Sequence, residues 1–102
     1  MDEVDLVRHY LRGQNLEQLG RIDEAVEVYE LAVAGRFDSA GPYDRLIHLY
    51  GAQARHAEVI RIADRALGSV QTYEDKRAWY AKVRSDAVTA AEKVPPATPK
   101  RD

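Results

Sequence analysis

The stretch GRIDEAVEVYELAV, from Gly20 to Val33, returns later in the chain as ARHAEVIRIADRAL, from Ala54 to Leu67. Three pairs of small or apolar residues align between the two stretches, each pair 34 positions apart: Ala25 with Val59, Tyr29 with Ala63, and Ala32 with Ala66. A fixed offset over several pairs indicates a structural repeat, and this period is typical of helix–turn–helix units. We therefore expect two similar helical hairpins stacked on one another.

The length of the chain suits one domain with a modest core. Its 102 residues are 45% hydrophobic and 31% charged, which is ordinary for a folded protein. The net charge of −2 argues against a nucleic-acid binder, and the absence of cysteine excludes disulfides and thiolate metal sites. No apolar run reaches the length of a membrane span, and the N-terminal MDEVDLV is acidic where a signal peptide would be basic. The sequence thus predicts a cytoplasmic protein.

Apolar residues recur at helical spacing in five segments, which predicts an all-α fold. We expect a first helix ending near residue 19, then helices at about 22–35, from Pro42 to about 50, at about 55–67 and at about 73–93. Thr72 with Asp75 is a capping-box pattern for the last of these helices. The predicted domain spans 1–94, with repeat units at about 6–39 and 40–72, a capping helix at about 73–93, and a flexible tail at 95–102.

Each predicted helix has an apolar side that we expect to face the core. In the first helix we expect the inward residues to be Leu6, Val7, Tyr10, Leu11, Leu16 and Leu19. In the fourth helix they are Val59, Ile60, Ala63, Ala66 and Leu67. In the fifth helix they are Trp79, Tyr80, Val83, Ala87, Ala90 and Ala91. In the second helix Ala25 and Ala32 flank Tyr29, and small residues around a large ring allow two helices to pack closely. Gly13 in the first helix predicts the close approach of a second helix at that point.

The pattern of Gly20, Glu24-Ala25, Tyr29 and Ala32 resembles the second half of a tetratricopeptide repeat. The segment FDSAGPYDRLIHLYGAQARHAEVIRIADRAL is similar to tetratricopeptide-like modules of small bacterial proteins. The first half of the first unit departs from the family, since His9 and Arg12 stand where large apolar residues are usual. The resemblance covers about residues 6–70 and implies a right-handed α–α superhelix of two hairpins, which a long capping helix closes.

In that family the first helix of each pair lines a concave groove that holds a peptide. Transferring this register to the chain implies a partner-binding groove formed by Tyr10, Gln14, Glu17, Asp44, Arg45, His48, Asp75, Trp79 and Lys82. The family's carboxylate-clamping lysines and asparagines are missing at these positions, so we expect aromatic anchors together with Arg45 and Lys82 facing an acidic group. For Tyr10 and Trp79 a place in the core is an open alternative, because large aromatic side chains are usually buried.

Other chemistry has little support in the sequence. His9, His48 and His56 lack the paired spacing of metal ligands, and His9 suits a half-buried, hydrogen-bonded place. No glycine-rich phosphate loop or nucleophile elbow is present, and the acid pairs Asp23-Glu24 and Glu74-Asp75 are explained by helix N-termini. We expect no catalytic residues, no cofactor and no metal.

The sequence therefore predicts a non-enzymatic protein–protein interaction module that binds a peptide or partner helix. An alternative is self-association into a homodimer, because two repeats and a cap are fewer than a stable array usually has, and the first or fifth helix could pair with a second copy. A third, weaker alternative is nucleic-acid binding through Arg55, Arg61 and Arg65 of the fourth helix, where the interleaved Glu58 and Asp64 instead favour an ion-paired surface.

Overall fold

A computed structural model describes residues 2–70 and 74–93 of the chain. Within these residues the fold is all-helical and has no strand, as the sequence predicts. The five helices are α1 (Glu3–Gln18), α2 (Ile22–Ala34), α3 (Gly41–Ala52), α4 (His56–Ser69) and α5 (Glu74–Lys93). The predicted Thr72 cap and the predicted tail at 95–102 lie outside the described residues. None of the described helices combines the length and the apolar character that a membrane crossing requires.

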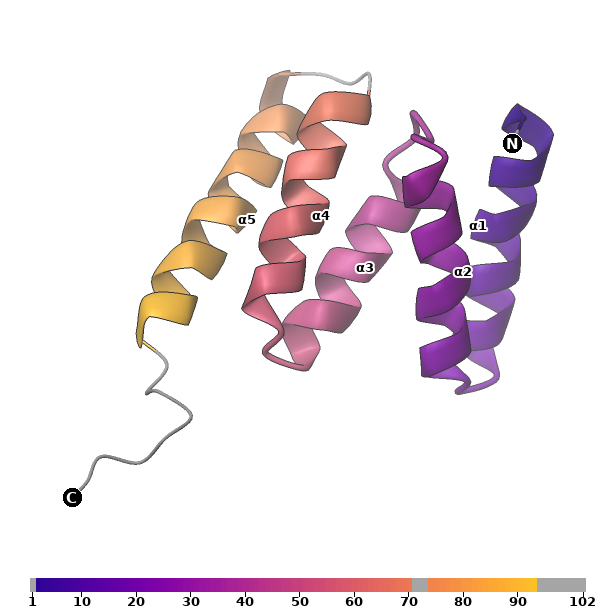
Figure 1. Ribbon diagram of the computed structural model, residues 1–102, viewed down its shortest axis with the longest axis horizontal. Helices are drawn as coiled ribbons and strands as arrows, with labels where there is room; N and C mark the ends of the chain where they lie inside the picture. Colours follow the sequence, from indigo (N-terminus) through magenta and orange to yellow (C-terminus); the bar gives the residue numbers. More distant parts are fainter. Residues whose placement is uncertain (1, 71–73, 94–102) are drawn as a thin grey trace.

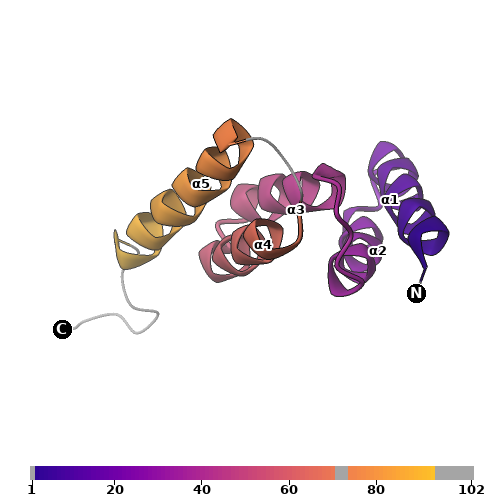
Figure 2. The ribbon, with the colours of Figure 1, turned by 90° about the horizontal axis from the view of Figure 1, so that it is seen from above.

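The helices form a row in which each packs against the next along the chain (Figure 1). Seen from above, α1, α3 and α5 lie on one side of the row, and α2 and α4 lie on the other (Figure 2). Helices α2, α3 and α4 each have two neighbours in sequence to pack against, whereas α1 stands at one end of the row. This arrangement gives the molecule one side built from α1, α3 and α5.

The repeat extends to the backbone of the two tight turns between paired helices. Gly20 and Ala54, which are 34 positions apart, both adopt the left-handed conformation, with φ of 77° and 57°. The next residues, Arg21 and Arg55, have nearly the same dihedral angles (φ −90° and ψ 70°; φ −89° and ψ 73°). Each arginine donates its backbone N–H to a carbonyl five residues back and pairs with a glutamate three residues on. The two hairpins are therefore connected in the same way.

The centre of the first hairpin is the ring of Tyr29, which is fully buried. Ala25 and Ala32 on the same helix are also fully buried, so the predicted arrangement of small residues around an aromatic ring is confirmed. A Cβ placed on Gly13 would lie only 2.4 Å from the Tyr29 ring, which confirms the predicted close approach of α1 and α2 at this glycine. The equivalent residues in the second hairpin, Val59, Ala63 and Ala66, are buried as well.

Several apolar residues do not face the core as predicted. In α1, Leu6 and Leu16 are buried, but Val7, Leu11 and Leu19 are exposed. The reason is that α1 stands at the end of the row and packs mainly on α2, so one side of the helix is left uncovered.

Helix α4 packs against both α3 and α5, and its buried side is shifted around the helix from the predicted one. It includes the fully buried Ile62, which the sequence analysis missed, whereas Ile60 and Leu67 are only half-buried. In α5, Tyr80 and Ala87 are buried as predicted, but Trp79 and Ala91 are exposed.

Candidate functional site

The side of the molecule built from α1, α3 and α5 is called the odd-helix face below, and the nine predicted groove residues belong to its three helices. At the α1–α3 contact, the Arg45 guanidinium binds the Glu17 carboxylate through two hydrogen bonds, with Nε–Oε1 and Nη2–Oε2 distances of 3.0 and 2.6 Å. The Tyr29 hydroxyl donates to the same carboxylate at 2.7 Å. These donors hold the pKa of Glu17 below its ordinary value, with the Arg45 hydrogen bond as the largest cause. Arg45 is thus already paired within the chain.

A shallow pocket of about 180 Å³ lies at this contact, lined by Gln14, Glu17, Gln18, Tyr29 and Arg45. The Gln14 amide donates to the Tyr10 hydroxyl at 3.0 Å. Tyr10 is half-buried: its ring centroid lies 6.1 Å from that of Tyr29, and its tip fills the space where a Cβ of Gly41 would be. Tyr10 is therefore an interhelix residue whose hydroxyl holds the amide of Gln14, one of the pocket's lining residues.

At the α3–α5 contact, Asp44 accepts a hydrogen bond from the Tyr80 hydroxyl at 2.8 Å and pairs with Lys76 at 2.7 Å. The Lys76 ammonium lies 4.2 Å from the centroid of the Trp79 ring, a cation–π contact. Trp79 is 39% exposed and packs edge-on against Tyr80, so it is a surface aromatic and not a core residue. This contact presents an indole ring to solvent in a fixed position.

The remaining predicted residues are exposed. His48 on α3 and Asp75 on α5 are open to solvent. Lys82 forms an ion pair with Asp86 one turn further along α5, with its side chain 72% exposed. The structure therefore brings the predicted residues together in two groups. The group at the α1–α3 contact holds Tyr10, Gln14, Glu17 and Arg45. In the group at the α3–α5 contact, Lys76 contacts both Asp44 and Trp79. Arg45 and Lys82 each form an ion pair within the chain, with Glu17 and Asp86, and their expected role toward an acidic group of a partner stays a prediction.

The sequence analysis did not assign Gln18 or Lys76 to this face, and it placed Tyr80 in the core without foreseeing its hydrogen bond to Asp44. Tyr80 had a usable signal, since it lies 34 positions after the buried Leu46 and continues the repeat into α5. Lys76 lies three residues before Trp79, a spacing that places the two side chains together on a helix. Nothing in the sequence distinguishes Gln18 as a site residue from the other polar residues near it.

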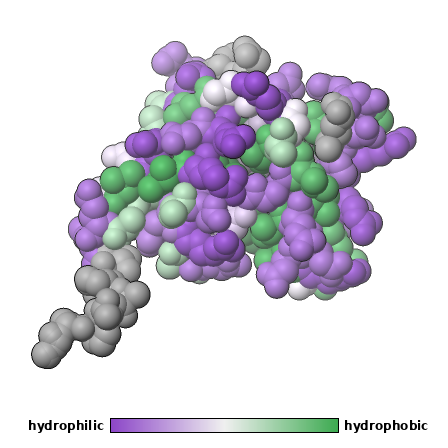
Figure 3. All heavy atoms as spheres, in the orientation of Figure 1, coloured by the Kyte–Doolittle hydropathy of each residue, from purple (hydrophilic) through white to green (hydrophobic). Residues whose placement is uncertain are grey.

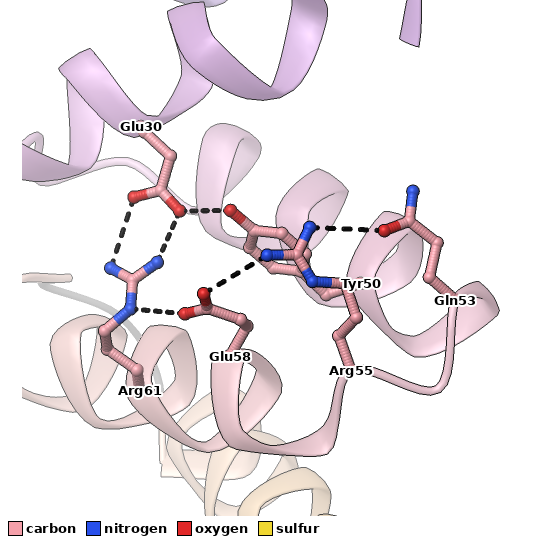
Figure 4. A network of polar contacts seen from close by, with 6 residues as sticks. All are labelled: Glu30, Tyr50, Gln53, Arg55, Glu58 and Arg61. Atoms are coloured by element: carbon pink, nitrogen blue, oxygen red, sulfur yellow. Dashed lines mark hydrogen bonds and ion pairs between the residues drawn. The ribbon is translucent and has the colours of Figure 1, made fainter. Parts of the chain in front are cut away.

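A second polar cluster joins α2, α3 and α4 (Figure 4). Glu30 accepts hydrogen bonds from the Tyr50 hydroxyl and, in a bidentate pair, from Arg61. Glu58 bridges Arg61 and Arg55. Two of the three arginines proposed as a phosphate-binding strip are therefore bound to carboxylates, while Arg65 is exposed. On the side seen in Figure 1, polar side chains cover most of the surface and apolar atoms appear in separate patches (Figure 3).

Of the residues that the structure describes, no three histidine or acidic side chains converge to hold a metal ion. His9 is half-buried on α1, His48 is exposed on α3 and His56 begins α4, so the three rings do not form one cluster. Comparison of the chain with protein-family models, with curated proteins and with solved structures finds no match.

Proposed function

We propose that the chain is a non-enzymatic protein-interaction module with a tetratricopeptide-like arrangement, which holds a peptide or a partner helix across the odd-helix face. The observation that carries the proposal is the fixed placement of surface groups on this face. The Glu17–Arg45 pair and the Asp44–Lys76–Tyr80 cluster tie α1 to α3 and α3 to α5. A partner would meet a largely preformed surface, and preformed surfaces lose less entropy on binding.

The contacts with the partner would come from groups that the chain does not use internally. Trp79 offers an exposed aromatic anchor, and exposed His48 offers a hydrogen-bond donor or acceptor. The pocket at Gln14 and Gln18 would add the Gln18 amide and the Gln14 amide oxygen for a peptide backbone, since the Gln14 amide nitrogen already donates to Tyr10. Arg45 and Asp44 have a supporting role in this proposal, because their charges are satisfied within the chain. Asp75 and Lys82 would lie at the rim.

The experiment is site-specific photocrosslinking in the native cell, with p-benzoylphenylalanine at position 48 and, as a control, at the exposed position 65 of α4. The proposal expects one partner captured at position 48 and not at 65. The purified partner should then bind the Trp79→Ala variant at least about tenfold more weakly, as for an interface anchor. Equal capture at both positions, or unchanged affinity of a Trp79→Ala variant with normal helicity, would contradict the proposal.

Self-association is a second candidate, and the exposed aliphatic residues of α1 favour it. Val4, Leu11 and Leu19 are 56%, 51% and 68% exposed. Sedimentation equilibrium over a hundredfold dilution distinguishes a dimer from a monomer. Nucleic-acid binding through α4 has less support, because Arg55 and Arg61 form ion pairs with Glu58. Steeply salt-dependent binding to a duplex of arbitrary sequence would revive that alternative.

A further inference from the structure

A pocket lies along α1 and the turn that leads into α2. It has a volume of about 420 Å³. The side chains that line it are Arg8, Leu11, Arg12, Asn15, Leu16, Leu19 and Arg21. Leu16 is buried beneath it, whereas Leu11 and Leu19 are 51% and 68% exposed. This "α1 pocket" is separate from the odd-helix face, since it has no lining residue in common with the pocket at Glu17 and Arg45.

The charge of the α1 pocket is one-sided. Its three ionisable lining residues are arginines, and none of the lining residues is acidic. Arg21 pairs with Glu24, but Arg8 and Arg12 form no ion pair within the part of the chain that the structure describes. On the other helices Arg45, Arg61 and Arg84 are paired with carboxylates, whereas Arg65 and Arg77 form no ion pair among the described residues. What distinguishes Arg8 and Arg12 is that they line a pocket beside exposed leucines, where the charge of Glu24, already paired with Arg21, acts only on Arg12.

We infer that the α1 pocket is a second docking site, for an acidic amphipathic segment of another protein. An aliphatic or aromatic side chain of the segment packs on Leu11 and Leu19, and its flanking carboxylates bind Arg8 and Arg12. Arginine suits this role because its guanidinium binds a carboxylate bidentately, while its stem packs on apolar surface. Interfaces of this kind combine an apolar centre with a charged rim.

The same charges disfavour a second copy of this chain as the occupant. A homodimer through α1 has a twofold axis, and residues near the axis meet their own copies. Because Leu11 lies between Arg8 and Arg12 in sequence, an axis at Leu11 gathers four arginines around it. The acids of the same helix and its N-cap lie towards the two ends: Asp2, Glu3 and Asp5 near the start and Glu17 near the end. The Asp2 carboxylate already accepts the backbone N–H of Asp5, and Glu17 is bound by Arg45. A partner that supplies carboxylates removes the repulsion.

The test uses two synthetic helical peptides with leucine at helical spacing: one flanked by glutamates, and a twin with lysine at each glutamate position. Fluorescence anisotropy of the labelled peptides measures affinity. The inference expects binding of the acidic peptide alone, weakening several-fold as salt is raised, because exposed charge pairs are screened. Arg8→Glu/Arg12→Glu should lose at least about tenfold in affinity. Arg65→Glu, a similar charge reversal on α4, and His48→Glu on the odd-helix face should bind normally.

Equal binding of both peptides, binding of neither, or an equal loss in Arg65→Glu would overturn the inference. Loss of binding in His48→Glu would place the peptide on the odd-helix face and also contradict it. Two further results would assign the pocket to another occupant: a wild-type dimer that Leu11→Ser dissolves, or co-sedimentation with anionic lipid vesicles that Arg8→Glu/Arg12→Glu abolishes. Leu11 is an exposed residue, so its replacement leaves the fold intact.

Discussion

Replacing Gly13 with alanine tests the contact on which the first hairpin depends. The new Cβ would lie 2.4, 2.6 and 2.8 Å from three carbons of the Tyr29 ring. Non-bonded carbons settle at about 3.5–4.0 Å, so the ring or the helix must move by about 1 Å. The ring has little freedom, because it is fully buried and its hydroxyl is bonded to Glu17.

The magnitude follows from two opposing effects. Overpacking of a filled core costs about 1–3 kcal/mol. Alanine in place of glycine inside a helix returns about 1 kcal/mol. Gly68→Ala on α4 isolates the second effect, because nothing lies within 4 Å of a Cβ at that position. We expect Gly68→Ala to raise the free energy of unfolding by about 1 kcal/mol. The free energy of unfolding of Gly13→Ala should be about 1–3 kcal/mol lower than that of Gly68→Ala.

Urea unfolding followed by circular dichroism measures both variants. The difference between them corresponds to several degrees in melting temperature for a chain of this size, roughly 4–8 °C for each kcal/mol. If Gly13→Ala is stabilised as much as Gly68→Ala, the ring of Tyr29 does not pack on α1 at this point. A Tyr29→Leu background offers an internal check, because removal of the ring should abolish most of the penalty.

Three further predictions concern the turns and the buried polar groups. Ala54→Gly should raise the free energy of unfolding by about 1 kcal/mol, because Ala54 has a φ of 57°, where glycine is unstrained. The control Ala57→Gly, inside α4, should lower the free energy of unfolding. Equal effects of the two substitutions would refute the assignment of strain to Ala54. Arg45 lowers the pKa of Glu17, so the contribution of the Glu17 carboxylate to the free energy of unfolding is complete above the ordinary pKa of 4.5 and is lost as pH falls through the lowered pKa. The stabilities of wild type and Glu17→Gln, measured by acid unfolding, should therefore converge at low pH. Curves that stay parallel would be inconsistent with this. Burial raises the pKa of Tyr29 and Tyr50, so the unfolded chain loses these protons first and the free energy of unfolding should fall as pH rises past the ordinary value of 10. A Tyr29→Phe/Tyr50→Phe variant that loses as much stability as wild type over this pH range would contradict the prediction.

The helical content and the interior of the first hairpin could be predicted from the sequence because they depend on local patterns. Gly13, Ala25, Tyr29 and Ala32 form a size pattern that permits one close packing. The orientation of α1 could not be predicted in the same way. Val7 and Leu11 are four residues apart, as are Leu6 and Tyr10, so both pairs fit one apolar side of a helix. The sequence does not say how much of that side neighbouring helices cover.

The polar contacts of the candidate site were beyond prediction for a different reason. Glu17 and Arg45 are 28 positions apart, and Asp44 and Tyr80 are 36 apart. With 31% of residues charged, many such pairings are compatible with the spacing of the helices. The side chains that meet across a helix contact determine which cations are neutralised within the chain. Arg45 reaches Glu17 and so has a structural role, whereas Trp79 stays at the surface.

An NMR titration of the isotopically labelled chain with the partner captured by crosslinking tests whether the odd-helix face is the proposed binding surface. We expect chemical-shift changes grouped at Gln14, Gln18, His48 and Trp79, with the amides of α2 and α4 largely unaffected. Changes grouped on α2 and α4, with His48 and Trp79 unmoved at saturation, would contradict it.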